Sequence, residues 1–408
     1  MNNFLEFTSS HYAPALQIQY TQSVVKVMLD KLPKGLNLQD LVLFNQSSNL
    51  IKLEVALYSA GLIGNLTNPK NCMVTQRLKI KSQADNAILI GDSSGFQEAK
   101  APTPPKPKKI VDIFNWLITY CNLAMTLDVP LGAAREDKSP HYRTFRDCLG
   151  QTLANLDTFT NLGAQDYSFL NVVQGQSIEE INFWYQHVKK YKLYGWALPF
   201  KCFGLTGFIW FLLKLIEDGE FDKDNTWIHC LGVSDLSSAA MFNVIIGHLR
   251  RKVAPCKVNI TFDSSSPFLA GGKLLSAYGA PVISSSKLSI PQIRVDKPKW
   301  CGSSELFPSQ YTQISRYLTK GDIINRDWDN EAIASNLGYL LLQNHNTETA
   351  LRAIGTVNNL LAVDSNQIPI CLVKAKRAIE HIFSSETINQ ALVRLSCTDN
   401  VMSLESYK

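Results

Sequence analysis

The sequence predicts an α/β fold in which eight parallel strands form a barrel and helices surround it. From residue 87 to about 275, six short apolar runs alternate with stretches of helical period, and polar residues or glycine follow the runs. One or two further strands are available upstream, and repeated strand–helix units of this kind form a parallel sheet. The count matches a TIM-type (β/α)8 barrel, and 408 residues suffice for such a barrel with N-terminal and C-terminal additions.

The first 60 residues carry the least regular pattern. Short apolar runs separated by polar residues occur at 17–20, 41–44 and 51–58, and we expect each of them to be a strand. Among them are the one or two strands that the barrel still requires.

Strands and helices then alternate along the chain. Strands are expected at 88–91, 122–127, 169–173, 193–198, 227–231 and 258–262. Helices are expected at 110–120, 135–162, 177–190, 203–217 and 237–252. The run 207–216 is the most apolar of the chain, but it is too short to span a bilayer and contains Lys214, so it predicts a buried helix.

The C-terminal part of the chain has a different pattern. Residues 276–335 are loop-rich, whereas 336–361 and 369–395 have a helical period. We therefore divide the chain into a barrel with N-terminal strands over 1–275 and a segment over 276–408 whose loops and helices pack on that barrel.

Composition and charge set limits on the class of protein. The net charge of +5 is compatible with a polyanionic partner without indicating one. The nine cysteines show no CxxC spacing, which is typical of reduced thiols in a cytosolic protein. The N-terminus lacks the basic and apolar segments of a signal peptide. We expect a cytoplasmic protein without a membrane segment.

The residues that follow the predicted strands are the first candidates for a functional site. The carboxyl ends of the strands of a βα barrel all lie at one mouth, where such folds place their chemistry. The strand-end residues expected to converge there are Asp92, Asp128, Gln174, Gly195, Gly232 and Asp263.

Two of these strand ends share a motif. Asp92 and Asp263 each end an apolar run and are each followed by two serines. Two carboxylates that meet across one pocket can divide the work, one as nucleophile and the other as proton carrier. The alternative interpretation is that both are helix N-caps, since Asp and Ser commonly begin the helix that follows a strand.

A basic loop follows the first of these motifs. Residues 101–109 contain four prolines together with Lys106, Lys108 and Lys109, a composition that excludes a helix or a central strand. The loop is either a solvated connector or an arm that contacts phosphates.

Six of the strand-end motifs, in order from about residue 85 to 270, resemble the tRNA-guanine transglycosylase superfamily, whose members exchange guanine for a 7-deazaguanine on a βα barrel. The stretch 92–97, Asp-Ser-Ser-Gly-Phe-Gln, is similar to that family's Asp-Ser-Gly-Gly-Phe-Gln. The other matching motifs are Leu127-Asp128, Val173-Gln174-Gly175, Tyr194-Gly195-Trp196-Ala197-Leu198, Leu231-Gly232-Val233, and Phe262-Asp263 with Pro267 beyond. One such motif is weak evidence, whereas six in order are specific for the superfamily.

The resemblance implies a role for each matching residue and implies no cofactor. Asp263 would attack C1′ of the target nucleoside, expel guanine and form a covalent sugar ester, and Asp92 would carry the proton of the leaving and incoming bases. Asp128 and Gln174 would hydrogen-bond the aminopyrimidinone edge of the base. The residues expected to line the rest of the base pocket are Ser93, Phe96, Gly195, Leu231 and Gly232, with Phe96 and Leu231 stacking on the ring.

Three departures from the family pattern concern the nucleic acid and the metal. The segment from Pro267 to Lys273 lacks the arginines that help the tRNA enzymes to hold RNA. The family's structural zinc motif is reduced to Cys301 and His345, and one Cys with one His does not make a tetrahedral site. His345 is therefore interpreted as a structural helix residue rather than a metal ligand. Third, Ser94 replaces a glycine of the first motif.

These losses favour the branch of the superfamily that places 7-deazaguanines into DNA, found in bacterial modification clusters and phages. We expect DNA and a base of the 7-cyano-7-deazaguanine (preQ0) type as partners. Candidate nucleic-acid contacts are Lys106, Lys108, Lys109 and Lys273. A helper protein that opens the duplex and a homodimer are left open.

Three other hypotheses remain. The chain is a tRNA transglycosylase with a degenerate RNA-binding end, a non-catalytic subunit that binds nucleic acid, or an unrelated βα-barrel hydrolase. The presence of Asp92, Asp128, Gln174 and Asp263 together disfavours the non-catalytic subunit. His229, within a strand, is interpreted as a core residue rather than a catalyst.

Overall fold

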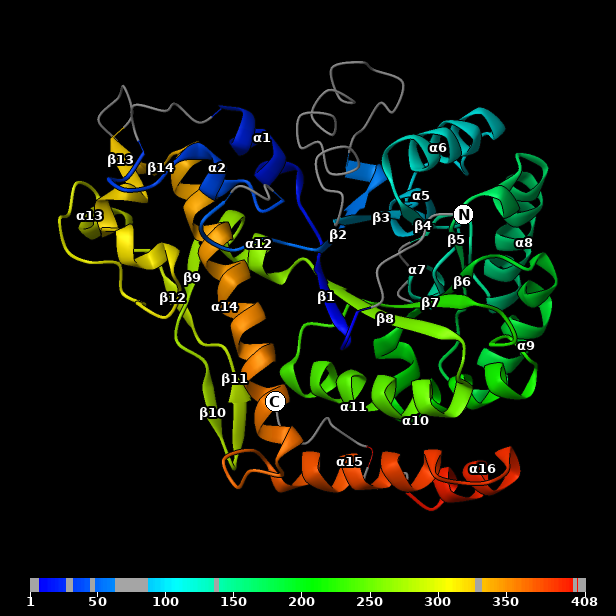
Figure 1. The fold of residues 1–408 in the computed structure, drawn as a ribbon. Helices are drawn as coiled ribbons and strands as arrows, with labels where there is room; N and C mark the ends of the chain where they lie inside the picture. The colour runs from blue at the N-terminus through cyan, green and yellow to red at the C-terminus, as the bar shows by residue number, and fades with distance from the viewer. Residues whose placement is uncertain are drawn as a thin grey trace.

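Eight parallel strands form one sheet that curls into a barrel with helices around it (Figure 1). The computed structural model describes residues 7–26, 32–44, 48–62, 87–135, 139–326, 332–398 and 402. The barrel strands are β1 (His11–Pro14), β2 (Val55–Ser59), β3 (Ile88–Asp92), β4 (Leu123–Met125), β5 (Phe169–Val172), β6 (Gly195–Pro199), β7 (Asn225–Leu231) and β8 (Lys257–Ser264). The predicted (β/α)8 architecture is confirmed.

The barrel closes between its first two strands. β1 pairs with β8 on one side, and β2 to β8 follow each other in sequence order around the sheet. On the other side, Ala15 forms an isolated parallel bridge with Leu57, and the N–H of Leu16 donates to the Leu57 carbonyl over 2.9 Å. The closed sheet therefore leaves no long exposed edge.

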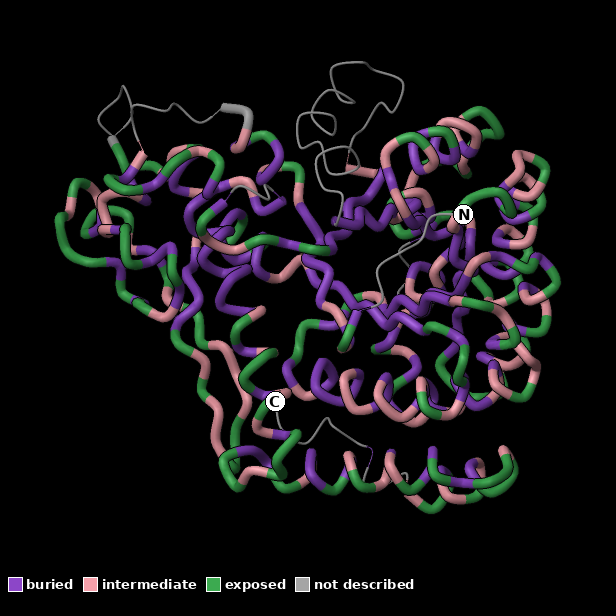
Figure 2. The backbone as a smooth tube through the Cα atoms, in the orientation of Figure 1, coloured by how far each residue is buried: buried purple, intermediate pink, exposed green. Residues whose placement is uncertain are grey.

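Side chains of alternate strand residues fill the barrel interior. Buried apolar residues of β3, β4, β5 and β7 meet there, among them Ile90, Met125, Val172 and Trp227. Because side chains alternate between the two faces of a strand, every second residue points inward. Figure 2 shows the strands as largely buried and the outer faces of the helices as exposed.

The outer layer is made of long helices that follow the strands. They are α6 (Pro107–Tyr120), α8 (Phe145–Asn161), α9 (Ile178–Val188), α10 (Phe200–Glu217) and α11 (Leu236–Val253). Three shorter helices, α5 (Gly95–Ala99), α7 (Leu131–Arg135) and α12 (Ser266–Gly272), directly follow the ends of β3, β4 and β8. No helix among the described residues is long and apolar enough to cross a membrane.

Two of the N-terminal strand predictions are wrong. Residues 18–26 form helix α1 (Ile18–Lys26), and the run 41–44 is the end of the short helix α2 (Leu38–Leu41) followed by a turn. Tyr20 of α1 is fully buried, and its ring packs edge-on against Phe268 of α12. A short apolar run buries equally well as a helix or a strand, so its period cannot distinguish the two.

The single helix predicted over 135–162 is also wrong. The chain forms α7 up to Arg135 and α8 only from Phe145. Thr144 caps α8 by accepting the N–H of Asp147 over 3.1 Å, while the Asp147 carboxylate accepts the N–H of Thr144. This capping box fixes where α8 begins.

Residues 276–326 and 332–334 form short hairpins and turns, and three helices follow. The strands are β9 (Ser276–Tyr278) with β12 (Gln292–Arg294), β10 (Val282–Ser284) with β11 (Lys287–Ser289), and β13 (Ile324–Arg326) with β14 (Ala332–Ala334). The short helices there are α13 (Lys297–Trp300), η5 (Ile314–Tyr317) and η6 (Lys320–Asp322). The long helix α14 (Asn336–Ala362) packs against α1, α11 and α12, and α15 (Ile370–Phe383) and α16 (Ile388–Ser396) continue beneath the barrel (Figure 1).

Candidate functional site

The carboxyl ends of the strands bring together the polar residues that the sequence singled out. Asp92 ends β3, Asp128 and Gln174 follow β4 and β5, and Asp263 is the penultimate residue of β8. Ile90 and Val172 fill the barrel interior two residues before Asp92 and Gln174. The two-residue period of a strand therefore directs Asp92 and Gln174 inward at the mouth.

Asp263 is held from the neighbouring strand β7. Its Oδ1 accepts the N–H of Gly232 over 3.0 Å, and it lies 3.4 Å from Nε2 of His229. Oδ2 has no hydrogen bond to any described residue. The helix that follows, α12, is capped by Ser265, so the interpretation of Asp263 as an N-cap is wrong. Oδ1 of Asp263 is therefore hydrogen-bonded, whereas Oδ2 can contact a ligand.

Gly232 supports this arrangement through its backbone. It has φ +74°, in the left-handed region that glycine adopts without strain. That conformation accompanies the turn that leads from β7 and points its N–H at Asp263.

Asp92 is a partly buried carboxyl group whose surroundings raise its pKa. Its Oδ1 accepts the N–H of Ser94 over 3.1 Å, and the N-cap of α5 is Ser94 rather than Asp92. Burial raises the pKa of Asp92, and the nearby charge of Asp263 raises it further, while a hydrogen bond from Ser59 partly offsets both. A carboxyl group with a raised pKa holds a proton that it can donate.

Ser94 fixes the turn after Asp92. It has φ +74° and ψ +28°, a conformation that favours glycine, and glycine is the residue that the family motif has there. Its hydroxyl lies 2.9 Å from the hydroxyl of Ser59 and accepts the N–H of Gly61. Hydrogen bonds of the Ser94 side chain to β2 and to the η2 turn (Ala60–Leu62) therefore stabilise a backbone conformation that glycine adopts without strain.

Asp128 and Gln174 form a directly bonded pair. Gln174 Nε2 donates to Asp128 Oδ2 over 2.7 Å, and both side chains are buried. Burial raises the pKa of Asp128 to about 7, against the lowering effect of Gln174. On either side of Asp128 the backbone is anchored, because the Leu127 carbonyl accepts from Asn155 and the Val129 N–H donates to Thr152.

Gly95 lets the ends of β3 and β4 approach each other. A Cβ at Gly95 would lie 2.3 Å from the carbonyl oxygen of Asp128 and 2.9 Å from its Oδ1. Only glycine fits this contact, which sets the first helical residue after Asp92 against Asp128.

The other predicted base-pocket residues take different positions. Ser93 is buried and donates its hydroxyl to the Thr126 carbonyl over 3.0 Å, so it joins the ends of β3 and β4. Phe96, in α5, is 37% exposed, with Lys100 Nζ 3.7 Å from its ring centre. Leu231 ends β7 and is partly buried at the top of the interior cluster.

Gly195 does not lie at the mouth, and its prediction as a strand-end residue is wrong. It is the first residue of β6, and the residue at the carboxyl end is Pro199. A Cβ at Gly195 would lie 2.1 Å from the Trp227 carbonyl oxygen, so this glycine serves the close approach of β6 and β7. The strand begins and ends later than the apolar run suggested.

The predicted nucleic-acid contacts lie at two helix ends. Lys106 is the N-cap of α6, Lys108 and Lys109 are in its first turn, and Lys273 follows α12. Lys106, Lys108 and Lys273 are exposed, whereas Lys109 lies 3.3 Å from Glu98 in an ion pair. The prolines of 101–109 lead into this helix, since Pro107 occupies its first position.

His345 is buried in α14 and uses both ring nitrogens. Nδ1 lies 2.7 Å from the Thr312 hydroxyl, and Nε2 lies 2.7 Å from the Tyr278 carbonyl oxygen. Burial lowers the pKa of His345 to about 4. Cys301 is partly buried, and within the described ranges no three His, Cys, Asp or Glu side chains gather as a metal site. The hydrogen bonds of the His345 ring join α14 to Tyr278 of β9 and to Thr312.

His229 is a site residue that the sequence interpretation missed. It is fully buried, as predicted for a core residue, yet Nε2 lies beside the Asp263 carboxylate. No local sequence signal identifies it, because its position beside Asp263 depends on the register of β7 with β8, in which His229 pairs with Thr261, two residues before Asp263. His229 and Thr261, at inward-facing positions of β7 and β8, therefore lie one layer below the Asp263 carboxylate.

The two larger of the cavities described lie outside the barrel interior. One, of about 790 Å³, is lined by residues that follow β6, β7 and β8, including Lys201, Ser234, Ser237 and Ser266. It therefore opens on the same side as Asp263.

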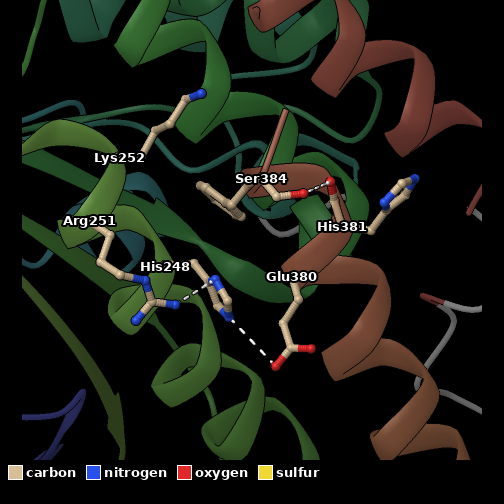
Figure 3. A pocket seen from close by; sticks show the side chains of 7 residues that line it. His248, Arg251, Lys252, Glu380, His381 and Ser384 are labelled. Atoms are coloured by element: carbon tan, nitrogen blue, oxygen red, sulfur yellow. Dashed lines mark hydrogen bonds and ion pairs between the residues drawn. The ribbon is translucent and has the colours of Figure 1, made fainter. Parts of the chain in front are cut away.

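The other cavity, of about 610 Å³, lies between α11 and α15 (Figure 3). Arg251 donates to His248 over 2.8 Å, and His248 lies 3.8 Å from Glu380. These groups tie two helices together on the outside of the barrel. No strand-end carboxylate lines this cavity.

Comparisons with known proteins do not add to this picture. No protein-family model and no curated protein sequence gives a significant match to the chain.

Proposed function

We propose that the protein is a base-exchange transglycosylase that replaces guanine in DNA with a 7-deazaguanine through a covalent ester between Asp263 and the sugar. The observation that carries the proposal is the grouping of Asp92, Asp263 and the Asp128–Gln174 pair at the carboxyl ends of the strands, around one barrel mouth. The resemblance of the strand-end motifs supports the same activity.

In the first half-reaction, Oδ2 of Asp263 attacks C1′ of the target nucleotide and the C1′–N9 bond breaks. The electron pair of that bond stays on the departing guanine, which takes a proton from Asp92. The raised pKa of Asp92 supports its role as the acid. The product is a sugar–Asp263 ester with inverted configuration at C1′.

In the second half-reaction the incoming base reverses these steps. Asp92, now ionised, accepts the N9 proton of the 7-deazaguanine, N9 attacks C1′, and the ester bond to Asp263 breaks. Two inversions restore the original configuration. Atoms and electrons balance without a redox partner or a metal.

The Asp128–Gln174 pair supports recognition of a guanine-like edge. The Asp128 carboxylate can accept from the N–H groups of an aminopyrimidinone, and the Gln174 amide, which has both donors and an acceptor, bonds beside it. A buried pair of this kind rejects a base that leaves it unpaired. Phe96, in the helix after β3, and Leu231, at the end of β7, suit the two faces of the ring.

Two observations favour DNA over tRNA as the polymer. The α12 segment from Pro267 to Lys273 offers only Lys273 in place of the arginines of the tRNA enzymes. His345, at the position of the family's zinc-ligating histidine, is committed to Thr312 and Tyr278. The exposed Lys106 and Lys108 at the start of α6 suit phosphates of a strand whose target base has left the stack.

The test is isotope exchange with the purified protein. Labelled 7-cyano-7-deazaguanine is incubated with duplex DNA, single-stranded DNA and unmodified tRNA, and the digested nucleosides are read by mass spectrometry. The proposal predicts label in a deoxynucleoside, lost in Asp263→Asn and retained in the matched surface variant Asp296→Asn. Label in tRNA alone contradicts the choice of DNA, and no label in any polymer contradicts base exchange.

A further inference from the structure

We propose that His229 is a positioning residue that donates a hydrogen bond from Nε2 to Oδ1 of Asp263 and so fixes which oxygen of the nucleophile is free to attack. The inference rests on the proposed function for its consequence, although the hydrogen bond itself can be tested without it. Three hydrogen-bonded side chains inside the barrel, those of Trp227, Thr261 and His229, lead to this nucleophile.

The chain begins at Trp227. Its Nε1 lies 2.7 Å from the hydroxyl oxygen of Thr261, and an indole nitrogen can only donate, so Thr261 is the acceptor. The Thr261 oxygen also lies 2.9 Å from Nδ1 of His229. Trp227, Thr261 and His229 are all fully buried, so no solvent competes for these bonds.

We assign the direction of the second bond from both ends of the His229 ring, because the Thr261 oxygen could also accept from Nδ1, whereas the Asp263 carboxylate can only accept from Nε2. With the indole as donor to its oxygen, the Thr261 hydroxyl has one proton left to donate, and Nδ1 of His229 is within reach of it. A ring whose Nδ1 accepts carries its proton on Nε2. Trp227 thus donates to Thr261, Thr261 donates to His229, and the Nε2–H of His229 faces Asp263.

Nε2 of His229 is directed at Asp263. It lies 3.4 Å from Oδ1 and has no hydrogen-bond partner elsewhere in the described part of the chain. A buried ring nitrogen without a partner is costly, and a bare lone pair facing a carboxylate oxygen would be repelled. The separation exceeds that of a formed N–H···O bond, about 2.9 Å, and bonds of this kind tighten in the substrate complex.

The consequence concerns the geometry of the nucleophile. Oδ1 of Asp263 already accepts from the Gly232 N–H, so a second donor to the same atom fixes the rotation of the carboxylate. Oδ2, without a partner among described residues, is then the oxygen that faces C1′. A nucleophile held in its attacking orientation reacts faster than one that must find it.

The hydrogen bond is tested first by NMR on the intact protein labelled with ¹⁵N-histidine. Long-range ¹H–¹⁵N correlation reports which ring nitrogen is protonated, and the His229→Gln variant assigns the signal. We expect a protonated Nε2 whose resonance shifts in Asp263→Asn and stays in place in Asp296→Asn. A ring protonated on Nδ1 alone, or an Nε2 resonance unaffected by Asp263→Asn, overturns the inference.

The positioning role is tested by base exchange in a matched pair of variants. His229→Leu removes the donor, whereas His229→Gln keeps an amide N–H near the position of Nε2. Loss of one preorganised donor lowers kcat about 100-fold, so we expect that loss in His229→Leu with little change in KM, and recovery of most of it in His229→Gln. Equal rates in the wild type and a folded His229→Leu, checked by its thermal unfolding, overturn the positioning role.

The NMR experiment and the base-exchange experiment together distinguish a failure of the proposed function from a failure of the inference about His229. If the wild-type protein performs no exchange, the proposed function fails, and the NMR experiment still decides whether His229 donates to Asp263. If exchange proceeds but Nε2 is unprotonated, the function stands and the inference is wrong.

Discussion

Gln174 Nε2 donates to Asp128 Oδ2 over 2.7 Å, which joins the ends of β4 and β5 inside the barrel mouth. The bond fixes the rotation of the carboxylate, whose other oxygen, Oδ1, faces Gly95. It also makes Asp128 the group whose protonation controls the pair, because burial raises the pKa of Asp128 to about 7.

The raised pKa of Asp128 predicts a pH-dependent cost in stability. In the folded protein this carboxyl releases its proton at about pH 7 instead of the ordinary 3.8, so the folded state binds more protons between these values. Stability is therefore lost as pH rises through this window and levels off above it, by about 4 kcal/mol in all. Chemical denaturation at pH 5 and pH 8 should show the part of this loss that falls above pH 5, about 3 kcal/mol, in the wild type and not in Asp128→Asn. A parallel pH dependence in both proteins contradicts the assignment.

The same carboxylate predicts the strength of base binding. Asp128→Asn replaces a charged acceptor with an amide, and loss of a hydrogen bond to a charged group costs about 2 kcal/mol, on the order of 30-fold in affinity. Calorimetric titration with 7-cyano-7-deazaguanine at pH 8 should show that loss. In the wild type the affinity should fall between pH 8 and pH 5.5, because protonation removes the charge of Asp128 and turns one of its acceptor oxygens into a donor. Unchanged affinity in the variant would exclude Asp128 from base recognition.

Gly95 provides a steric test of the same pocket. In Gly95→Ala the new methyl group would lie 2.3 Å from the Asp128 carbonyl oxygen, so α5 or the β4 end must shift. We expect lower thermal stability and weaker base binding, measured by thermal unfolding and calorimetry.

The matched control is Gly150→Ala in α8, where a Cβ meets nothing within 4 Å. Alanine in a helix interior is favoured over glycine by about 1 kcal/mol, so this variant should be at least as stable as the wild type and bind the base normally. Equal behaviour of the two alanine variants would show that the Gly95 contact is unimportant.

The two hydrogen bonds of His345 predict that this residue stabilises the folded protein without a metal ion. His345→Phe leaves the Thr312 hydroxyl and the Tyr278 carbonyl without their partner, at a cost of about 2 to 4 kcal/mol for two buried groups. Denaturant unfolding should show this loss, and a chelator should leave the wild-type midpoint unchanged. A lower midpoint in chelator, together with bound zinc measured by elemental analysis, would restore the role of metal ligand.

Local pattern predicted the parts of the site that lie on regular strands. Asp92 and Gln174 continue the inward-facing alternation of β3 and β5, so the end of each apolar run located them correctly. The prediction of Gly195 as a strand-end residue was wrong because β6 begins at Gly195, later than the apolar run, and ends at Pro199.

The rest of the site depends on pairings that no short window of sequence contains. His229 meets Asp263 through the register of β7 with β8, and His345 meets Tyr278 from 67 residues away. The N-terminal helix α1 was mistaken for a strand because its burial comes from α12 and α14 rather than from its own period.

The central claim, that Asp263 forms an ester with the sugar, is tested most directly by trapping that ester. Protein is incubated with target DNA while released guanine is removed and no incoming base is supplied, then denatured and digested for peptide mass spectrometry. The account predicts a protein–DNA adduct on the peptide that carries Asp263, absent in Asp263→Asn and present in Asp296→Asn. Base exchange without any adduct, or an adduct on a different residue, would contradict it.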